Sequence, residues 1–317
     1  MGDVLIMPIN FEGMNDDYIT LFDLMEYVER IKILPNVKEH LKYTNEEFVE
    51  YMKKVAQLDN DNVLIYLFLL LYQELVFNQK IENQKFDIYS LADRAPFFDT
   101  LSISHKRIHQ LHNFVIAKEI SEGTMEETFD YRNVPVNVSR ITKEKGEEIF
   151  YRGANPEDVH KFMSEFIKVY KQISSVEELN DPFLASALMH LLFVRIHPYT
   201  DGNGRTARVI HNMKFTEMIN KEYGTRLKLS PLNLSVSILI NKITYVKRLN
   251  NIYFNTVDDT NDSINKWFDF VLDMVDERLY VAKGQLGRLD SYILGKMEHN
   301  EQVDVKSMRL SRFKRHL

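Results

Sequence analysis

Helix-start and helix-stop signals occur along most of this 317-residue chain, and they constrain its fold more than any other feature. Apolar residues recur at helical spacing in stretches that begin after capping side chains or at a proline and end near a glycine or proline. No regular alternation of strands and helices is present, so a parallel sheet is not expected. The pattern predicts an all-α fold with helices over 63–82, 104–118, from 156 onward, 182–196, 202–224, 232–254 and 264–297.

One segment departs from the helical pattern. Runs of residues with high strand propensity at 134–141 and 148–152 flank Lys143-Glu144-Lys145-Gly146, which is typical of a turn. Two such runs around a short turn predict a β-hairpin. The expected architecture is therefore a helical bundle that carries one small hairpin.

Composition excludes several classes of protein. The chain has no cysteine, which rules out a disulfide scaffold, a thiol nucleophile and cysteine-ligated metal. Its net charge of -6 argues against a general nucleic-acid binder. The most apolar stretch, residues 63–71, falls well short of the about 20 apolar residues that a membrane span needs. We expect a cytoplasmic protein, without membrane contact and without a nucleic-acid partner.

The residues with the clearest chemistry form one segment, His197-Pro198-Tyr199-Thr200-Asp201-Gly202-Asn203-Gly204-Arg205-Thr206-Ala207-Arg208. Two glycines at a helix start let backbone N–H groups converge on an anion, and the helix dipole strengthens that site. Arg205 and Arg208 can project from one side of the helix, where guanidinium groups suit phosphate oxygens. Asp201 is placed to hold Mg²⁺, and His197 can accept a proton near neutral pH. The set predicts a site that binds a magnesium polyphosphate and deprotonates a nucleophile beside it.

The segment resembles the signature of the Fic family, His-x-Phe-x-(Asp/Glu)-Gly-Asn-Gly-Arg-x-x-Arg, and Tyr199 replaces the phenylalanine. The resemblance covers roughly residues 104–272. It implies the helical Fic fold with a hairpin flap, and an enzyme that transfers AMP from ATP to a hydroxyl side chain of a target protein. The position of Tyr199 packs into the core in this family, so the added hydroxyl needs a polar partner.

The resemblance also assigns a role to each motif residue. His197 would be the general base that activates the target hydroxyl, and Asp201 would hold Mg²⁺. Three residues would form the anion hole for the α- and β-phosphates of ATP: Gly202, Asn203 and Gly204. The cofactors implied are thus ATP and magnesium.

By the same resemblance, the remaining nucleotide contacts would come from residues elsewhere in the motif and after it. Arg205 would grip the β-phosphate and Arg208 the γ-phosphate, whereas Tyr253, with Trp267, resembles the wall on the adenine side. Gly204 favours AMP transfer, because the related Doc proteins have lysine there and transfer phosphate. Other Fic-type transfers, an AMP-removing phosphodiesterase and a non-catalytic nucleotide-binding regulatory module stay as alternatives.

A second resemblance concerns self-inhibition. Many Fic proteins carry a helix with Ser/Thr-x-x-x-Glu-Gly/Asn, whose glutamate pairs with the second motif arginine and blocks the γ-phosphate site. Asn78-Gln79-Lys80-Ile81-Glu82-Asn83, at the end of a helix expected over about 61–84, resembles it. Asn78 and Glu82 are four apart, so the amide could steady the carboxylate. The alternative is a solvated glutamate at a fraying helix end.

The predicted domains are an N-terminal helical region over 1–100, a Fic core over 101–275 and a C-terminal helical tail over 276–317. The resemblance implies that a target protein with a Ser, Thr or Tyr hydroxyl docks by strand addition on a flap near 138–151. It is also compatible with a homodimer. The basic end of the tail is expected to be solvated.

Four other histidines receive structural interpretations. His105, His109 and His112 fall at a spacing that can bind metal, but no carboxylate nearby in sequence completes a set. A polar helix face with one packed histidine is therefore expected. Arg208 is expected to be an exposed helix residue with little effect on stability, and His190 to support the loop at His197 from the core.

Overall fold

The structure is a computed structural model that describes residues 24–58, 60–82, 84, 100–142, 146–250, 252 and 257–298. The described chain is mainly helical, which confirms the predicted helical fold. Its helices are α1 (Leu24–Glu29), α2 (Pro35–Gln57), α3 (Asn60–Ile81), α5 (His105–Val115), α6 (Ala117–Ser121), α7 (Pro156–Gln172), α8 (Pro182–Ile196), α9 (Asn203–Tyr223), α10 (Ser235–Ile240), α11 (Lys242–Asn250) and α12 (Val257–Glu298). Two short 3-10 turns, Ile173–Ser175 and Glu177–Leu179, join α7 to α8.

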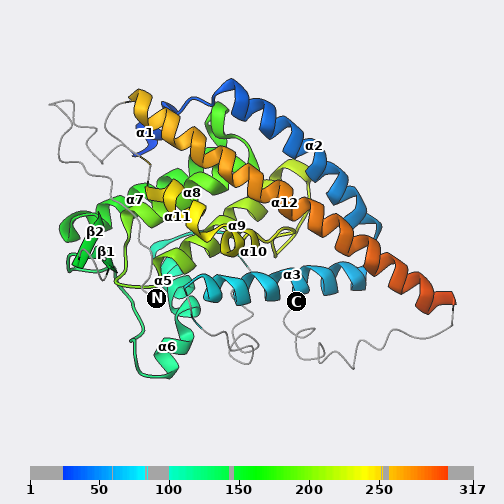
Figure 1. Ribbon diagram of the computed structural model, residues 1–317, viewed down its shortest axis with the longest axis horizontal. Coiled ribbons are helices and arrows are strands. Elements are labelled where there is room, and N and C mark those ends of the chain that lie inside the picture. The colour runs from blue at the N-terminus through cyan, green and yellow to red at the C-terminus, as the bar shows by residue number, and fades with distance from the viewer. Residues whose placement is uncertain are drawn as a thin grey trace.

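The pair α8 and α9 lies at the centre of the molecule (Figure 1). Every residue of α8 is buried, as expected for a helix that is apolar on all sides. Its start is fixed by Asp181, whose carboxylate accepts hydrogen bonds from the backbone N–H groups of Phe183 at 2.8 Å and Leu184 at 3.2 Å. The motif segment therefore connects the two most central helices.

The outer helices cover this pair from two sides. In Figure 1, α2 and α12 lie side by side along one edge, and α3 runs across the opposite side past α9 and α10. The ring of Phe48 on α2 packs edge-on against Phe183 on α8, with centroids 5.4 Å apart. Trp267 on α12 is buried against α8 and donates its indole N–H to the carbonyl of Ala187 at 3.0 Å. Residues before and after the motif thus share one hydrophobic core.

Two strands, β1 (Asn137–Thr142) and β2 (Gly146–Arg152), pair antiparallel from Asn137↔Arg152 to Thr142↔Gly146. The chain that leaves β2 then runs past the end of α8, where the N–H of Ala154 donates to the carbonyl of Ile196 at 3.4 Å. The base of the hairpin is therefore anchored beside the first motif residue.

Several element boundaries differ from the sequence predictions. The helix expected over 104–118 breaks at Ile116, and the helix expected over 232–254 is divided at Asn241 into α10 and α11. Helix α2 was not predicted from the sequence, because its charged residues outnumber the few buried ones spaced along it. The predicted boundary at 275/276 falls inside α12. Within the described ranges, no helix has both the length and the apolar character needed to cross a lipid bilayer.

Candidate active site

His197 closes the C-terminal end of α8 in a strained backbone conformation. Its φ of 54° and ψ of 60° are left-handed, and it is the one non-glycine residue with positive φ in the described part of the chain. Such a conformation persists only where surrounding contacts hold it, and it is common at functional sites. Here the carbonyl of His197 accepts from Arg132 Nε at 2.7 Å, and Arg132 N–H donates to Pro198 at 2.9 Å. Sequence reasoning did not find Arg132.

The imidazole of His197 is oriented as a base. Its Nδ1 lies 3.3 Å from the carbonyl oxygen of Val194, and because a carbonyl can only accept, Nδ1 carries the proton. The lone pair is then on Nε2. Burial lowers the pKa of His197 to about 4, and the neighbouring Arg132 also lowers it. The ring is therefore neutral, and able to accept a proton, at neutral pH.

The loop after His197 leads into a helix start that is shaped for an anion. The N–H of Tyr199 donates to Asn203 Oδ1 at 2.9 Å, and Asn203 Nδ2 donates back to the carbonyl of Tyr199 at 2.8 Å. Gly202 caps α9 with a φ of 75°, and a Cβ there would lie 2.7 Å from Ile116. The side chain of Asn203 is therefore used by the loop, and the first N–H groups of α9, which lack intrahelical acceptors, are the groups that an anion at this helix start could bind.

Two histidines of α5 support this loop from behind. The hydroxyl of Tyr199 lies 2.8 Å from His109 Nδ1, so the expected polar partner is present. The ring of His112 stacks on Tyr199 at 3.7 Å and 7°, and its Nδ1 lies 3.3 Å from Thr206 Oγ1. That hydroxyl donates to the carbonyl of Gly202 at 2.9 Å. The expectation of a polar face with a single packed histidine is wrong, because both His109 and His112 are buried under the motif.

Arg205 has other partners than the predicted phosphate. Its guanidinium is 1% exposed and is paired with the carboxylate of Glu119. It also donates to Gln79 Oε1 at 3.1 Å and lies 3.4 Å from Asp201 Oδ2. In this arrangement Arg205 braces the start of α9 against α3 and α6, and its contact with the β-phosphate stays a prediction.

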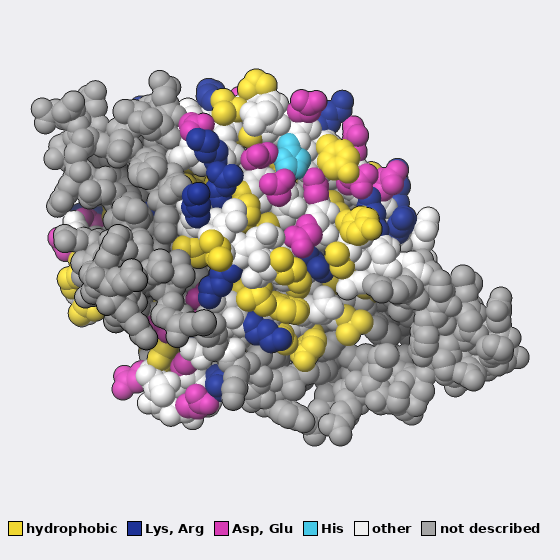
Figure 2. Space-filling view, in the orientation of Figure 1, with side chains coloured by type: hydrophobic (Ala, Val, Ile, Leu, Met, Phe, Trp, Pro, Cys, Tyr) yellow, Lys and Arg dark blue, Asp and Glu magenta, His cyan; other side chains and the backbone are white. Residues whose placement is uncertain are grey.

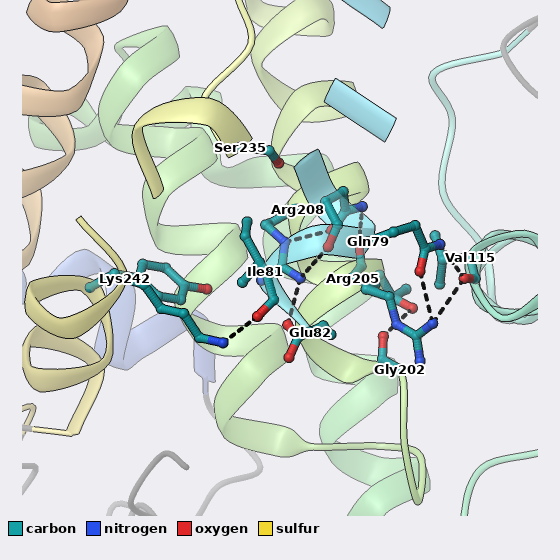
Figure 3. A network of polar contacts seen from close by, with 12 residues as sticks. Gln79, Ile81, Glu82, Val115, Gly202, Arg205, Arg208, Ser235 and Lys242 are labelled. Carbon is teal, nitrogen blue, oxygen red and sulfur yellow. Dashed lines mark hydrogen bonds and ion pairs between the residues drawn. The ribbon is translucent and has the colours of Figure 1, made fainter. Parts of the chain in front are cut away.

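Arg208 joins the motif to α3 (Figure 3). Its Nε donates to Asn78 Oδ1 at 2.6 Å, and its Nη2 donates to Glu82 Oε1 at 2.6 Å. The side chain is only 2% exposed, so the expectation of an exposed helix arginine is wrong. Asn78 contacts Arg208, and its Nδ2 donates to the carbonyl of Arg205 at 3.2 Å. The Asn78 amide thus holds α9 to α3 through both of its polar atoms. The expectation that it steadies the carboxylate of Glu82 stays a prediction.

The carboxylate of Glu82 lies over the start of α9. A Cβ built at Gly204 would be 2.8 Å from Glu82 Oε1, which places the carboxylate at the predicted phosphate site. Burial favours the neutral acid, but Arg208, Arg205 and Lys242 together lower the pKa of Glu82 below its ordinary value. Glu82 is therefore an ionised group at neutral pH, with 34% of its side chain exposed.

Arg208 is also supported from the core. Tyr245 on α11 forms a side-chain hydrogen bond with Arg208, and the hydroxyl of Tyr245 lies 2.8 Å from His190 Nε2. His190 is buried, as expected, but it acts on Arg208 through Tyr245 and not on the loop at His197. Trp267 is buried in the core, and its place on the adenine side stays a prediction, whereas Tyr253 lies outside the described residues.

Asp201 is the motif carboxylate that is open to solvent. Its side chain is 62% exposed, and its Oδ1 accepts from the N–H of Gly202 at 2.6 Å. Among the described residues, no three histidine, aspartate or glutamate side chains are grouped to hold a metal. One exposed carboxylate beside an anion site suits Mg²⁺ that is bound jointly with the phosphates of a nucleotide.

Comparison with known proteins agrees with this geometry. Residues 102–213 match the Fic/DOC family. A 57-residue stretch is 46% identical to a Nematostella vectensis protein named protein adenylyltransferase Fic. That stretch is 18% of this chain and 13% of the relative. Residues 102–213 therefore form a Fic/DOC-family domain, which contains α5, α6, the hairpin, α7, the two 3-10 turns, α8 and the first half of α9.

Over most of its length the chain has a fold similar to that of solved Fic structures. A Fic family protein from Desulfovibrio desulfuricans G20 superposes with a TM-score of 0.56 and 16% identity, covering 80% of this chain and 76% of that one. Fic-1 from C. elegans superposes with a TM-score of 0.51 and 16% identity, covering 80% and 73%. At this identity the likeness shows the fold alone.

Proposed function

We propose that this protein transfers AMP from Mg-ATP to a hydroxyl side chain of a target protein and releases pyrophosphate. One observation carries the proposal: a neutral His197 with its lone pair on Nε2 is joined by a short, tightly bonded loop to the glycine-lined start of α9. A base is thus fixed next to an anion site. That pairing is what activation of a hydroxyl beside a phosphate requires.

In this reaction Nε2 of His197 takes the proton from the target hydroxyl as its oxygen attacks the α-phosphate in line. The backbone N–H groups at 203–204 and the dipole of α9 would stabilise the charge that develops on the phosphate oxygens. Magnesium, held by Asp201, would neutralise charge on the phosphates. Positioning and electrostatics supply most of the catalysis in transfers of this type.

The hairpin is suited to align the target chain. Gly153, directly after β2, is so close to the motif that a Cβ there would lie 3.3 Å from His197 Cβ. An extended target segment that adds to a strand at 138–151 would therefore run toward the base. Among the described residues the sheet has two strands, and the outer edge of such a strand provides backbone groups for such pairing.

Glu82 would inhibit this activity in the structure as it stands. Its carboxylate pairs with Arg208, the guanidinium proposed to hold the γ-phosphate, and lies over Gly204. A bound γ-phosphate would meet a like charge at close range and lose its arginine. ATP would then bind weakly, or with its α-phosphate out of line.

Label transfer from ATP tagged at the α-phosphate tests the proposal. We expect Glu82→Gly to label itself or a target at least about tenfold faster than the native chain, because about 1.4 kcal/mol of lost repulsion already gives that factor. The added substitution His197→Ala should abolish the label. Label from the γ-phosphate would indicate phosphate transfer, and nucleotide binding without label in any variant would support a regulatory module.

AMP removal is the second candidate, because the same carboxylate is ionised and partly exposed beside the anion site. Glu82 could there position a water for attack on an AMP-modified side chain. Under this reading Glu82→Gly abolishes release of AMP from a modified protein. If Glu82→Gly labels no faster than the native chain and releases AMP no more slowly, Glu82 does not control either activity.

A further inference from the structure

The last turn of α3, which Glu82 directly follows, is held from two sides (Figure 3). On one side Lys242, the first residue of α11, donates from Nζ to the carbonyl of Ile81. On the other side Gln79 Nε2 donates to the carbonyl of Val115 at 2.7 Å. These contacts come from parts of the chain that are far apart in sequence, so this turn is held in place by the tertiary structure.

The contact with Lys242 acts directly on the backbone from which Glu82 projects. The carbonyl of Ile81 and the N–H of Glu82 belong to one planar peptide group. The N–H edge donates to the carbonyl of Gln79 at 3.1 Å, and the carbonyl edge accepts from Lys242. Both edges of the plane are therefore fixed. A positive group also suits this place, because the last carbonyls of a helix lack intrahelical donors and carry the negative end of the dipole.

The short helix α11 holds both members of the inhibitory pair. Lys242 and Tyr245 are three residues apart on α11 and so lie on the same side of it. Lys242 binds the backbone next to Glu82, while Tyr245 bonds to Arg208. The preceding helix is itself fixed to α3, since Glu74 accepts from the N–H and the hydroxyl of Ser235 at 3.0 and 2.6 Å.

We propose that Lys242 is a positioning residue that holds Glu82 over the nucleotide site, and that it sets how strongly the protein restrains its own nucleotide binding. This inference rests on the proposed function, in which Glu82 blocks the γ-phosphate. Lys242 acts through the backbone at Ile81 and through its charge near the carboxylate. Without the ammonium group, the turn at 79–82 opens more often and Arg208 becomes available to phosphate.

Binding of a non-hydrolysable ATP analogue with Mg²⁺ measures this effect without any need for catalysis. Lys242→Met should bind the analogue about three- to tenfold more tightly, as expected for the loss of one charge-assisted hydrogen bond. Lys242→Arg should restore the native affinity. Lys247→Met, which removes an exposed charge from the same helix, is the matched control and should change nothing. Amide hydrogen exchange over 79–82 should be faster in Lys242→Met alone, with the urea midpoint of each variant as the check on folding.

The background Glu82→Gly separates the two proposals. There Lys242→Met should have no further effect, because the carboxylate that it positions is absent. A similar gain, or a loss, of affinity in that background would show that Lys242 acts on the nucleotide itself and would overturn the inference. If Glu82→Gly binds more tightly but Lys242→Met does not, the inference alone fails. If Glu82→Gly also binds as the native chain does, the inhibitory role of Glu82 fails with it.

Discussion

The hydroxyl oxygen of Tyr199, a motif residue, has its hydrogen-bond partner outside the motif. Its ring lies flat on His112, and its hydroxyl reaches His109 in a region from which water is excluded. Neither contact involves the atoms at which a nucleotide would react. The hydroxyl therefore stabilises the folded core, and the ring positions the loop that holds His197.

Replacing Tyr199 with phenylalanine separates these two functions. Tyr199→Phe should lower the free energy of unfolding by about 1–2 kcal/mol, because Nδ1 of His109 loses its partner in the core. Urea denaturation measures this loss. The added substitution His109→Leu should recover part of it, since removing both partners leaves no unpaired group. Label transfer in the Glu82→Gly background should stay within about twofold of the value with Tyr199, and a large loss would mean that the hydroxyl takes part in the chemistry.

At the scale of elements, α3 and α9 are joined by a polar stripe. Glu74, Asn78 and Glu82 are four residues apart and lie along one side of α3. Glu74 accepts from Asn212 at 2.9 Å, and Asn78 and Glu82 both accept from Arg208 at 2.6 Å. Because higher numbers on α3 meet lower numbers on α9, the two helices are antiparallel. The stripe fixes the register in which α3 presents Glu82.

The sequence predicted the parts of this site whose residues are close together in the chain. The segment 197–208 could be recognised as a site because its glycines, arginines and histidine are neighbours in the chain. Asn78 and Glu82 could be paired because they are four residues apart at the end of one helix. Arg132 and Lys242 could not be found in this way, because their partners His197 and Ile81 are 65 and 161 residues away. The break between α10 and α11 was missed as well, since apolar spacing continues through Asn241.

The contact between α2 and α12 is expected to depend on pH. Figure 2 shows acidic side chains gathered beside a histidine on the face that these helices form. His40 Nδ1 lies 2.8 Å from Asp269 and Nε2 lies 3.1 Å from Asp276, so both nitrogens need protons to donate. Burial lowers the pKa of His40, but the two carboxylates raise it by more, above 6.5. Its stabilisation is therefore complete below pH 6.5 and is lost as pH rises through the raised value.

Replacing His40 should accordingly lower the free energy of unfolding more in acid than in base. His40→Asn is expected to lower the free energy of unfolding by about 1–2 kcal/mol at pH 6 and by less than about half of that at pH 9. Urea titrations at the two pH values measure the difference. His160→Asn removes an exposed histidine that pairs with Asp130, and it serves as a control that should have little effect. An equal cost of His40→Asn at both pH values would contradict the charged bridge.

For the whole molecule, the buried histidines change stability with pH in the direction opposite to His40: they make the fold less stable in acid. Burial lowers the pKa of His112 to about 3 and the pKa values of His197 and His211 to about 4. In the unfolded chain each would titrate near 6.5, so the unfolded state binds more protons in acid. The stability that these neutral rings contribute is present above pH 6.5 and is lost as pH falls toward 4. The protein should therefore unfold easily in mild acid.

His211 allows this prediction to be tested away from the motif loop. His211→Leu cannot be protonated, so the stability of the variant relative to the native chain should improve by roughly 1–3 kcal/mol between pH 6.5 and pH 4. Thermal unfolding followed by circular dichroism across that range gives the comparison. A constant difference between the two proteins would mean that His211 keeps its ordinary pKa in the fold.

Gly204 has a consequence for how this protein can change by mutation. Any side chain at 204 would meet the carboxylate of Glu82 at 2.8 Å and Arg208 Nη1 at 3.3 Å. A substitution there would displace the carboxylate of Glu82 and crowd Arg208 at once, so the proposed inhibition and the proposed activity would be damaged together. A change in α3 or α11 touches the restraint alone. We expect evolution to adjust the level of the proposed activity through the surrounding helices, while the motif at 197–208 stays fixed.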